Sequence, residues 1–132
     1  MILGIGVDVV RVSRMQSIVD RFGGRFPQRI LTGEELEELP GRRRSAPFLA
    51  KRFAAKEALV KALGTGFRFG VGPRDIGVRH DPLGRPYLVF SAVAQGLLDA
   101  RGVAESHLSL ADEEDLAVAF VTLLRQLQDS NP

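Results

Sequence analysis

The sequence contains no cysteine, which excludes disulfide frameworks, thiolate metal sites and cysteine nucleophiles and favours a reducing cytoplasmic setting. Its two histidines, His80 and His107, leave little for a histidine-based zinc site. No apolar run approaches the roughly 20 residues that span a bilayer. The opening stretch, Met1 to Gly4, also lacks the charged start of an export segment. We therefore expect no membrane partner.

The 132 residues are enough for one compact domain with a sizeable core. Hydrophobic residues make up 45% of the chain and charged residues 26%, which is ordinary for a globular protein and unlike a disordered one. No repeat or linker divides the sequence. We expect a single domain over residues 1–132, with the last few polar residues as a loose tail.

Positive charge is concentrated in one segment, although the formal net charge is only +2. Between Arg42 and Lys61 there are seven basic residues and a single acid, Glu57. Acidic residues are grouped elsewhere, around residues 34–38 and 112–115. A local basic field in a nearly neutral domain favours a polyanionic partner, which could be a nucleic acid, a nucleotide or an acidic protein.

Hydrophobic periodicity and capping residues predict an α+β fold with an antiparallel or mixed sheet. Ser13 and Gln16 form a capping-box pattern for a first helix, and Thr32 with Glu35 forms a second. A long alanine-rich helix is predicted from Pro47 to Leu63, with Gly64 as its C-cap, and Ser91 is predicted to cap a later helix. The predicted strands cover residues 2–10, 75–79, 86–90, 107–110 and 116–124.

Two carboxylates stand out from this pattern. Asp8 interrupts an apolar strand, where a carboxylate is costly to bury unless it is paired, hydrogen-bonded or metal-bound. Glu57 lies in the middle of the long helix. Each has an ordinary explanation: Asp8 could pair with Arg11, and Glu57 could pair with Lys61 four residues on. Together, they could instead hold a hard cation such as Mg²⁺.

Three segments carry a resemblance to a known family: Ile5–Val10 followed by Arg14, Phe53–Gly66, and His107–Asp112 running into Ala117–Ala119. In order and spacing the chain resembles the short bacterial 4′-phosphopantetheinyl transferases, the holo-acyl-carrier-protein synthases, from Met1 to about Leu124. The second segment is the most specific. The resemblance implies the fold of that family, a homotrimer, and a place in fatty acid biosynthesis.

The activity that the resemblance implies is a Mg²⁺-dependent transfer of 4′-phosphopantetheine from coenzyme A to a serine of apo acyl carrier protein, with release of adenosine 3′,5′-bisphosphate. Asp8 and Glu57 match the metal-binding positions, and Lys61 matches a lysine near the diphosphate that stabilises developing charge. Further positions match the coenzyme A contacts (Arg43, Arg44, Gly64, Arg85 and Pro86) and the helix that docks the acidic carrier protein (Arg14 and Arg21).

The sequence departs from the family pattern after the third segment, where Ala111 occupies the position of a histidine found in many relatives and Asp112 follows. The general base is therefore open between Glu57, acting through a water molecule, and Asp112. A different class of function, a basic nucleic-acid-binding module, would account for the arginine run but leaves Asp8 and Glu57 unexplained. We expect the transferase, with coenzyme A and carrier protein and no nucleic acid as its partners.

Overall fold

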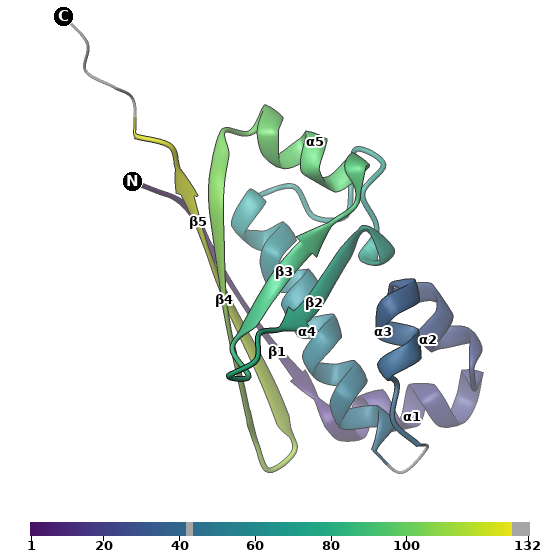
Figure 1. Cartoon of the computed structure of the whole chain (residues 1–132). Helices are drawn as coiled ribbons and strands as arrows, with labels where there is room; N and C mark the ends of the chain where they lie inside the picture. Colours follow the sequence, from purple (N-terminus) through teal and green to yellow (C-terminus); the bar gives the residue numbers. More distant parts are fainter. Residues whose placement is uncertain (42–43, 128–132) are drawn as a thin grey trace, which may run out of the picture.

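The computed structural model describes residues 1–41 and 44–127 (Figure 1). The helices are α1 Val12–Phe22, α2 Arg25–Ile30, α3 Gly33–Glu38, α4 Ser45–Leu63 and α5 Ala92–Ala100, with a short 3-10 turn, η1, at Pro73–Asp75. The strands are β1 Ile2–Arg11, β2 Ile76–His80, β3 Pro86–Phe90, β4 Val103–Glu113 and β5 Leu116–Arg125. Residues 128–132, where the loose tail was predicted, lie outside the described part.

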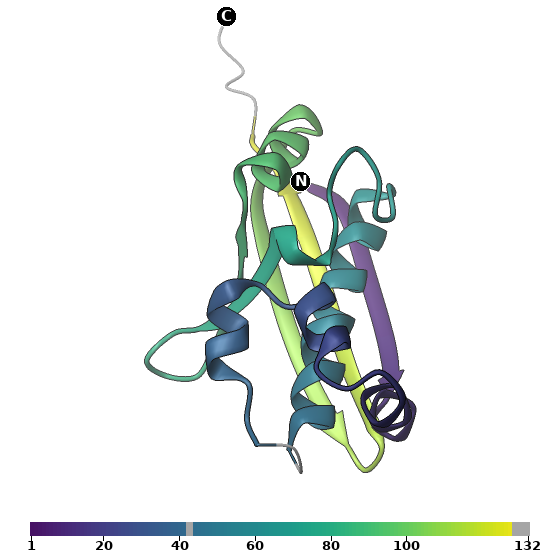
Figure 2. The same cartoon turned by 90° about the vertical axis from the view of Figure 1, so that its right-hand side faces the viewer.

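The main sheet has the order β1-β5-β4 and is antiparallel throughout. A separate antiparallel hairpin, β2-β3, contacts β4, and its turn projects from the side of the molecule away from β1 (Figure 2). The predicted α+β class with an antiparallel sheet is confirmed. The strand predicted at residues 107–110 extends in both directions, because β4 pairs with β5 along nearly its full length.

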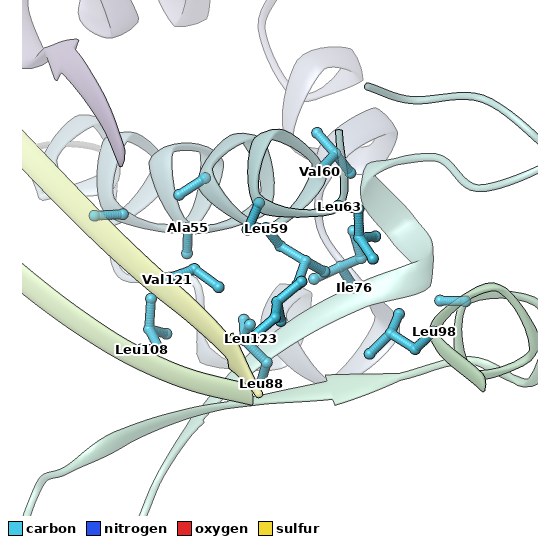
Figure 3. Packing of buried hydrophobic residues seen from close by; sticks show 14 of the residues in the cluster. Ala55, Leu59, Val60, Leu63, Ile76, Leu88, Leu98, Leu108, Val121 and Leu123 are labelled. Atoms are coloured by element: carbon cyan, nitrogen blue, oxygen red, sulfur yellow. The ribbon is translucent and has the colours of Figure 1, made fainter. Parts of the chain in front are cut away.

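Helix α4 packs on the inner face of the main sheet, as the alanine-rich segment predicted. Ala54, Ala55 and Ala58 are fully buried there, and the larger residues between α4, β5, β3 and α5 complete the core (Figure 3). Gly64 ends the helix in the left-handed conformation with φ 75°, as its predicted role as a C-cap requires.

Strand β1 lies unusually close to α4, because it turns glycines toward the helix. A Cβ atom built on Gly6 would lie 1.9 Å from the Ala58 carbonyl oxygen, and one on Gly4 would lie 2.0 Å from that of Ala62. No side chain fits at either glycine without a shift of the backbone. The contact is therefore between backbones, with only alanines on the helix side.

A buried ion network fastens α3 to α4. The Lys56 ammonium is fully buried and donates hydrogen bonds to the carbonyl oxygens of Ile30 and Pro73 and, at 2.6 Å, to Glu35 Oε1. Glu35 Oε2 accepts from the Val78 amide at 3.1 Å and lies 3.4 Å from Arg52 Nε. Burial lowers the pKa of Lys56, and the Glu35 carboxylate opposes that shift. Removing one partner of such a pair leaves a buried charge unpaired, at a cost of roughly 3–5 kcal/mol.

The two predicted capping boxes have different outcomes. Thr32 and Glu35 form the predicted box at the start of α3. The box predicted for Ser13 and Gln16 is wrong: α1 begins at Val12, two residues earlier than a cap at Ser13 implies, Arg11 occupies its N-cap without a side-chain bond, and Ser13 bonds to Asp115 instead. Helix α2 follows Gly23 and Gly24 and was not predicted from the sequence.

None of the helices in residues 1–41 and 44–127 is both long and apolar enough to cross a membrane.

We expect Gly6→Ala to destabilise the fold by about 1–3 kcal/mol, because the added methyl group overpacks the contact between β1 and α4. The measurement is the unfolding free energy from denaturant titration. Gly24→Ala is the matched control, since Gly24 has a helical φ of −66° and no atom within 4 Å of a built Cβ. Equal stability of the two variants would show that β1 can move away from α4 at no cost.

Candidate active site

Asp8 lies on the face of β1 that is turned toward α4, in register with Gly4 and Gly6. Its side chain is 15% exposed, and Oδ1 lies 2.8 Å from Lys61 Nζ. The Lys61 ammonium also donates to the Val7 carbonyl oxygen at 3.3 Å. Neither ordinary pairing considered from the sequence is therefore formed: Asp8 pairs with Lys61 rather than with Arg11, and Lys61 pairs with Asp8 rather than with Glu57.

Glu57 lies on α4, one turn before Lys61, and lines the same pocket as Asp8. Partial burial raises the pKa of Glu57 above its ordinary value, and the negative charge of Asp8 raises that pKa further. The Lys61 ammonium acts in the opposite direction. The structure thus brings together Asp8, Glu57 and Lys61, three of the four residues predicted to hold the metal or to act in catalysis, and the two carboxylates repel each other.

The pocket that holds both carboxylates has a volume of about 620 Å³ and lies between β1, α1 and α4. Its wall combines these carboxylates with the basic side chains of Arg11 and Arg14 and with apolar groups, chiefly Met15, Ile18, Phe26, Phe53 and Leu116. Carboxylate oxygens are the ligands that hard divalent cations prefer. Among the described residues no group of three or more acidic, histidine or cysteine side chains is arranged to hold a metal ion, and Asp8 and Glu57 are the carboxylates that line this pocket.

Asp112, the other candidate for the general base, is placed differently. It lies on β4, which β5 separates from β1, and its carboxylate is 3.5 Å from Lys51 Nζ near the start of α4. Asp112 does not line the pocket that contains Asp8 and Glu57. Within one chain the structure therefore groups Glu57, and not Asp112, with the candidate metal site.

The residues predicted to contact coenzyme A are spread over the molecule. Gly64 ends the helix that carries Glu57 and Lys61, and Arg44 is exposed just before the start of that helix. Arg43 lies outside the described residues. Arg85 and Pro86 line a separate hollow of about 320 Å³ between the β2-β3 hairpin and β4. The hairpin and β4, which form that hollow, lie at the opposite edge of the main sheet from β1, which carries Asp8 (Figure 2). One chain therefore does not bring all these residues together.

Arg14 and Arg21 are exposed on α1, as predicted for a docking helix, and the Arg21 guanidinium lies 5.3 Å from the centre of the Phe22 ring. Sequence reasoning missed Arg25 and Arg29, which are exposed on α2 beside them. Both arginines line a hollow of about 370 Å³ with Ile18, Phe22 and Phe26, which adjoins the larger pocket through Ile18 and Phe26. The i, i+4 spacing of the two arginines was the available signal, but helix α2 had not been recognised.

Comparisons with known proteins identify the family of this chain. The family model of the 4′-phosphopantetheinyl transferase superfamily matches residues 4–121. A holo-[acyl-carrier-protein] synthase of Nitrosococcus oceani is 52% identical over 132 residues, which cover all of this chain and 86% of the relative. The chain belongs to the 4′-phosphopantetheinyl transferase superfamily, in its group of holo-[acyl-carrier-protein] synthases. The predicted family and the predicted enzyme class, a phosphopantetheinyl transferase, are confirmed.

Solved structures show the same relationship. The crystal structure of a holo-[acyl-carrier-protein] synthase from Neisseria meningitidis has a TM-score of 0.90 at 45% identity, covering 95% of this chain and 100% of that one. A holo-(acyl-carrier-protein) synthase from Bacillus anthracis, solved in complex with CoA (3′,5′-ADP), has a TM-score of 0.78 at 38% identity, with coverage of 96% and 99%. These comparisons give no support to the nucleic-acid-binding module considered from the sequence.

We expect Glu57→Gln to raise the melting temperature at neutral pH in metal-free buffer. Because the native pKa of Glu57 is raised, ionising this carboxyl destabilises the folded state as pH rises from the unfolded value through the native one. Below about pH 4 both states are protonated and the gain should vanish. Thermal unfolding at pH 4 and pH 7.5 measures this, with Glu37→Gln, exposed on α3, as the control. A gain of equal size at both pH values would contradict the assigned cause.

Proposed function

We propose that this protein transfers the 4′-phosphopantetheine group of coenzyme A to a serine hydroxyl of apo acyl carrier protein, in the cytoplasm and for fatty acid biosynthesis. The other product is adenosine 3′,5′-bisphosphate. The observation that carries the proposal is that Asp8 and Glu57 line one pocket, with Lys61 ion-paired to Asp8, in a chain of this transferase family. The coenzyme A ligand named for the Bacillus anthracis relative supports the choice of donor.

Asp8 and Glu57 are the residues that hold Mg²⁺ in this proposal. The donor set fits, since Mg²⁺ is commonly bound by one or two carboxylates together with water and substrate phosphates. The raised pKa of Glu57 fits as well, because a cation between the two carboxylates relieves their repulsion. When bound, Mg²⁺ supplies charge neutralisation at the diphosphate oxygens.

Lys61 is the cation that reaches the diphosphate. Its side chain is 52% exposed, and its ammonium is ion-paired with Asp8, which lines the pocket. There a point charge can stabilise the negative charge that develops on the leaving phosphate. Gly64, one turn further along, ends α4 without a side chain that would obstruct the ligand.

Glu57 is the proposed general base, accepting the serine proton through a water molecule. Glu57 is suited to this role by its position, because its carboxylate lines the pocket that contains the proposed metal site. Asp112 is the weaker candidate, because its carboxylate is paired with Lys51 and lies outside the pocket.

The remaining coenzyme A contacts are assigned to two copies of the chain. Arg43 and Arg44 are proposed to bind the 3′-phosphate, whereas Arg85 and Pro86 face the adenine from a neighbouring copy, since they lie on the far edge of the sheet. The outer face of the sheet supports a homotrimer, because Ile5, Val7 and Val9 are each at least 50% exposed there. Exposed apolar surface of this kind is typical of a contact between subunits.

The carrier protein is proposed to dock on α1 and α2. Arg14, Arg21, Arg25 and Arg29 are exposed there, and none of them has an ion-pair partner among the described residues. Between them lie the apolar hollow and the pocket that contains Glu57. An acidic protein with an apolar ridge beside its acceptor serine matches both the charge and the shape of this surface.

The proposed function is tested by intact-mass measurement of an apo acyl carrier protein after incubation with this protein, coenzyme A and Mg²⁺. We expect a gain of one phosphopantetheine group, and almost none with Asp8→Asn, which keeps the shape of the side chain and removes its charge. A known transferase serves as the positive control. No gain with the wild-type protein, while the control succeeds, would refute the transfer. Tight, salt-dependent binding of random DNA in place of transfer would favour the nucleic-acid module.

We expect Arg14→Glu to raise KM for the carrier protein and to reduce the salt dependence of its association, while KM for coenzyme A stays unchanged. Charge reversal on the basic surface opposes an acidic partner, and Arg14 is not among the residues proposed to bind coenzyme A. Steady-state kinetics at two ionic strengths measures both constants. The matched control is Arg125→Glu at the far end of β5. Normal use of the carrier protein by Arg14→Glu at low salt would move the docking surface elsewhere.

A further inference from the structure

The end of the β4–β5 turn meets the first residues of α1. The Val12 amide donates to the carbonyl oxygen of Asp115 at 2.8 Å, and the Ser13 amide donates to Asp115 Oδ1 at 2.8 Å. The Ser13 hydroxyl donates to Asp115 Oδ2 at 2.5 Å. A single acidic residue of the turn therefore satisfies two backbone donors and one side chain at the start of a helix that is distant in sequence.

Helix α1 has no such acceptor of its own. Arg11 at its N-cap makes no side-chain hydrogen bond, and the first turn contains no acidic residue. The amide groups of a first turn need acceptors, and negative charge near them is favourable because of the helix dipole. Asp115, 102 residues away from Ser13 in the sequence, supplies both the acceptor and the negative charge.

The same contact fixes the direction in which α1 leaves the sheet. Strand β1 ends at Arg11 and α1 begins at Val12, so no loop separates them. Arg11 is in register with Leu116, the residue after Asp115, and Leu116 and Arg14 line the pocket of Asp8 and Glu57. Further along, Met15 and Val19 hold the helix by burial. Asp115 holds its first turn, where Arg14 lies.

We propose that Asp115 is a positioning residue for carrier-protein docking: it caps α1 and so holds Arg14 at the edge of the pocket. This inference rests on the proposed function. Asp115 does not line any hollow assigned to coenzyme A, so its effect should fall on one substrate only.

The charge of Asp115 and its capping role predict opposite effects of its removal on carrier-protein binding. If Asp115 acted only through its charge, removing it would strengthen the binding of an acidic carrier protein, because one repulsion would disappear. If it acts by holding α1, removing it weakens that binding. The sign of the effect therefore separates the two explanations.

The experiment compares three variants in steady-state transfer assays with each substrate varied in turn. Loss of a cap costs about 1 kcal/mol of helix stability, so Asp115→Ala should raise KM for the carrier protein by at most about fivefold, the value reached when the whole cost falls on docking. The turnover number and KM for coenzyme A should stay within about twofold of wild type. Asp115→Asn should keep KM for the carrier protein close to the wild-type value, because asparagine caps a helix as well as aspartate does. Glu113→Gln is the charge control, since Glu113 has no side-chain partner among the described residues.

Amide hydrogen exchange gives a readout that is independent of activity. Exchange at the first turn of α1 should become faster in Asp115→Ala but not in Glu113→Gln. Helix α5, which is capped by Ser91, should exchange as in the wild type in both variants. Unchanged or tighter use of the carrier protein by Asp115→Ala would overturn the inference. An equal rise of both Michaelis constants would also overturn it, since that result is expected from general destabilisation. Failure of the proposed function is seen separately, as a wild-type protein that modifies no carrier protein.

Discussion

The contact between β1 and α4 is the constraint on which the site depends. Because Gly4 and Gly6 present no side chains, the strand backbone approaches the carbonyl oxygens of Ala58 and Ala62 directly. Asp8 follows Gly6 by two positions and therefore faces the same helix. There its carboxylate is paired with Lys61 and lies close enough to Glu57 to raise the pKa of Glu57. Larger residues at the glycines would separate these groups by the thickness of a side chain. The glycines that allow β1 to pack on α4 therefore also determine how close Asp8 lies to Lys61 and Glu57.

The sheet divides the functional groups between its two edges. The carboxylates and Lys61 lie with β1, whereas the hollow of Arg85 and Pro86 lies beyond β4. A strand in the middle, β5, separates them with fully buried side chains such as Ala119 and Val121. This arrangement explains why the proposed coenzyme A residues lie at separate hollows rather than in one deep cleft.

Most of the fold could be predicted from the sequence, because most elements depend on local signals. These signals depend only on residues that are close together in the sequence. They are the glycine after α4, the caps at Thr32 and Ser91, and the apolar residues of the strands. The prediction for Ser13 was wrong for the same reason. The local pattern indicated that Ser13 caps α1, but its hydroxyl bonds to Asp115, which is distant in the sequence. Helix α2 is short and has no cap of its own, so it gave no comparable signal.

The candidate site was predictable only in part. Its three central residues belong to motifs of the family, so their identity was available without the fold. Their pairing was not, since whether Lys61 bonds to Glu57 or Asp8 depends on how closely two distant elements pack. Glu35 was recognised as a capping residue, but nothing in its neighbourhood indicated that it is 1% exposed and paired with Lys56.

That buried pair has a consequence for how the sequence can change over time. Lys56 lies beside Glu57 in the most specific motif of the chain, yet its ammonium is enclosed by Glu35 and two carbonyl oxygens and reaches no pocket. A neutral residue at either position alone leaves the other charge enclosed without a partner. Positions 35 and 56 should therefore vary together in related sequences or not at all. A lysine in the most specific motif of this chain thus serves the packing of the interior, although its neighbour Glu57 lines the candidate site.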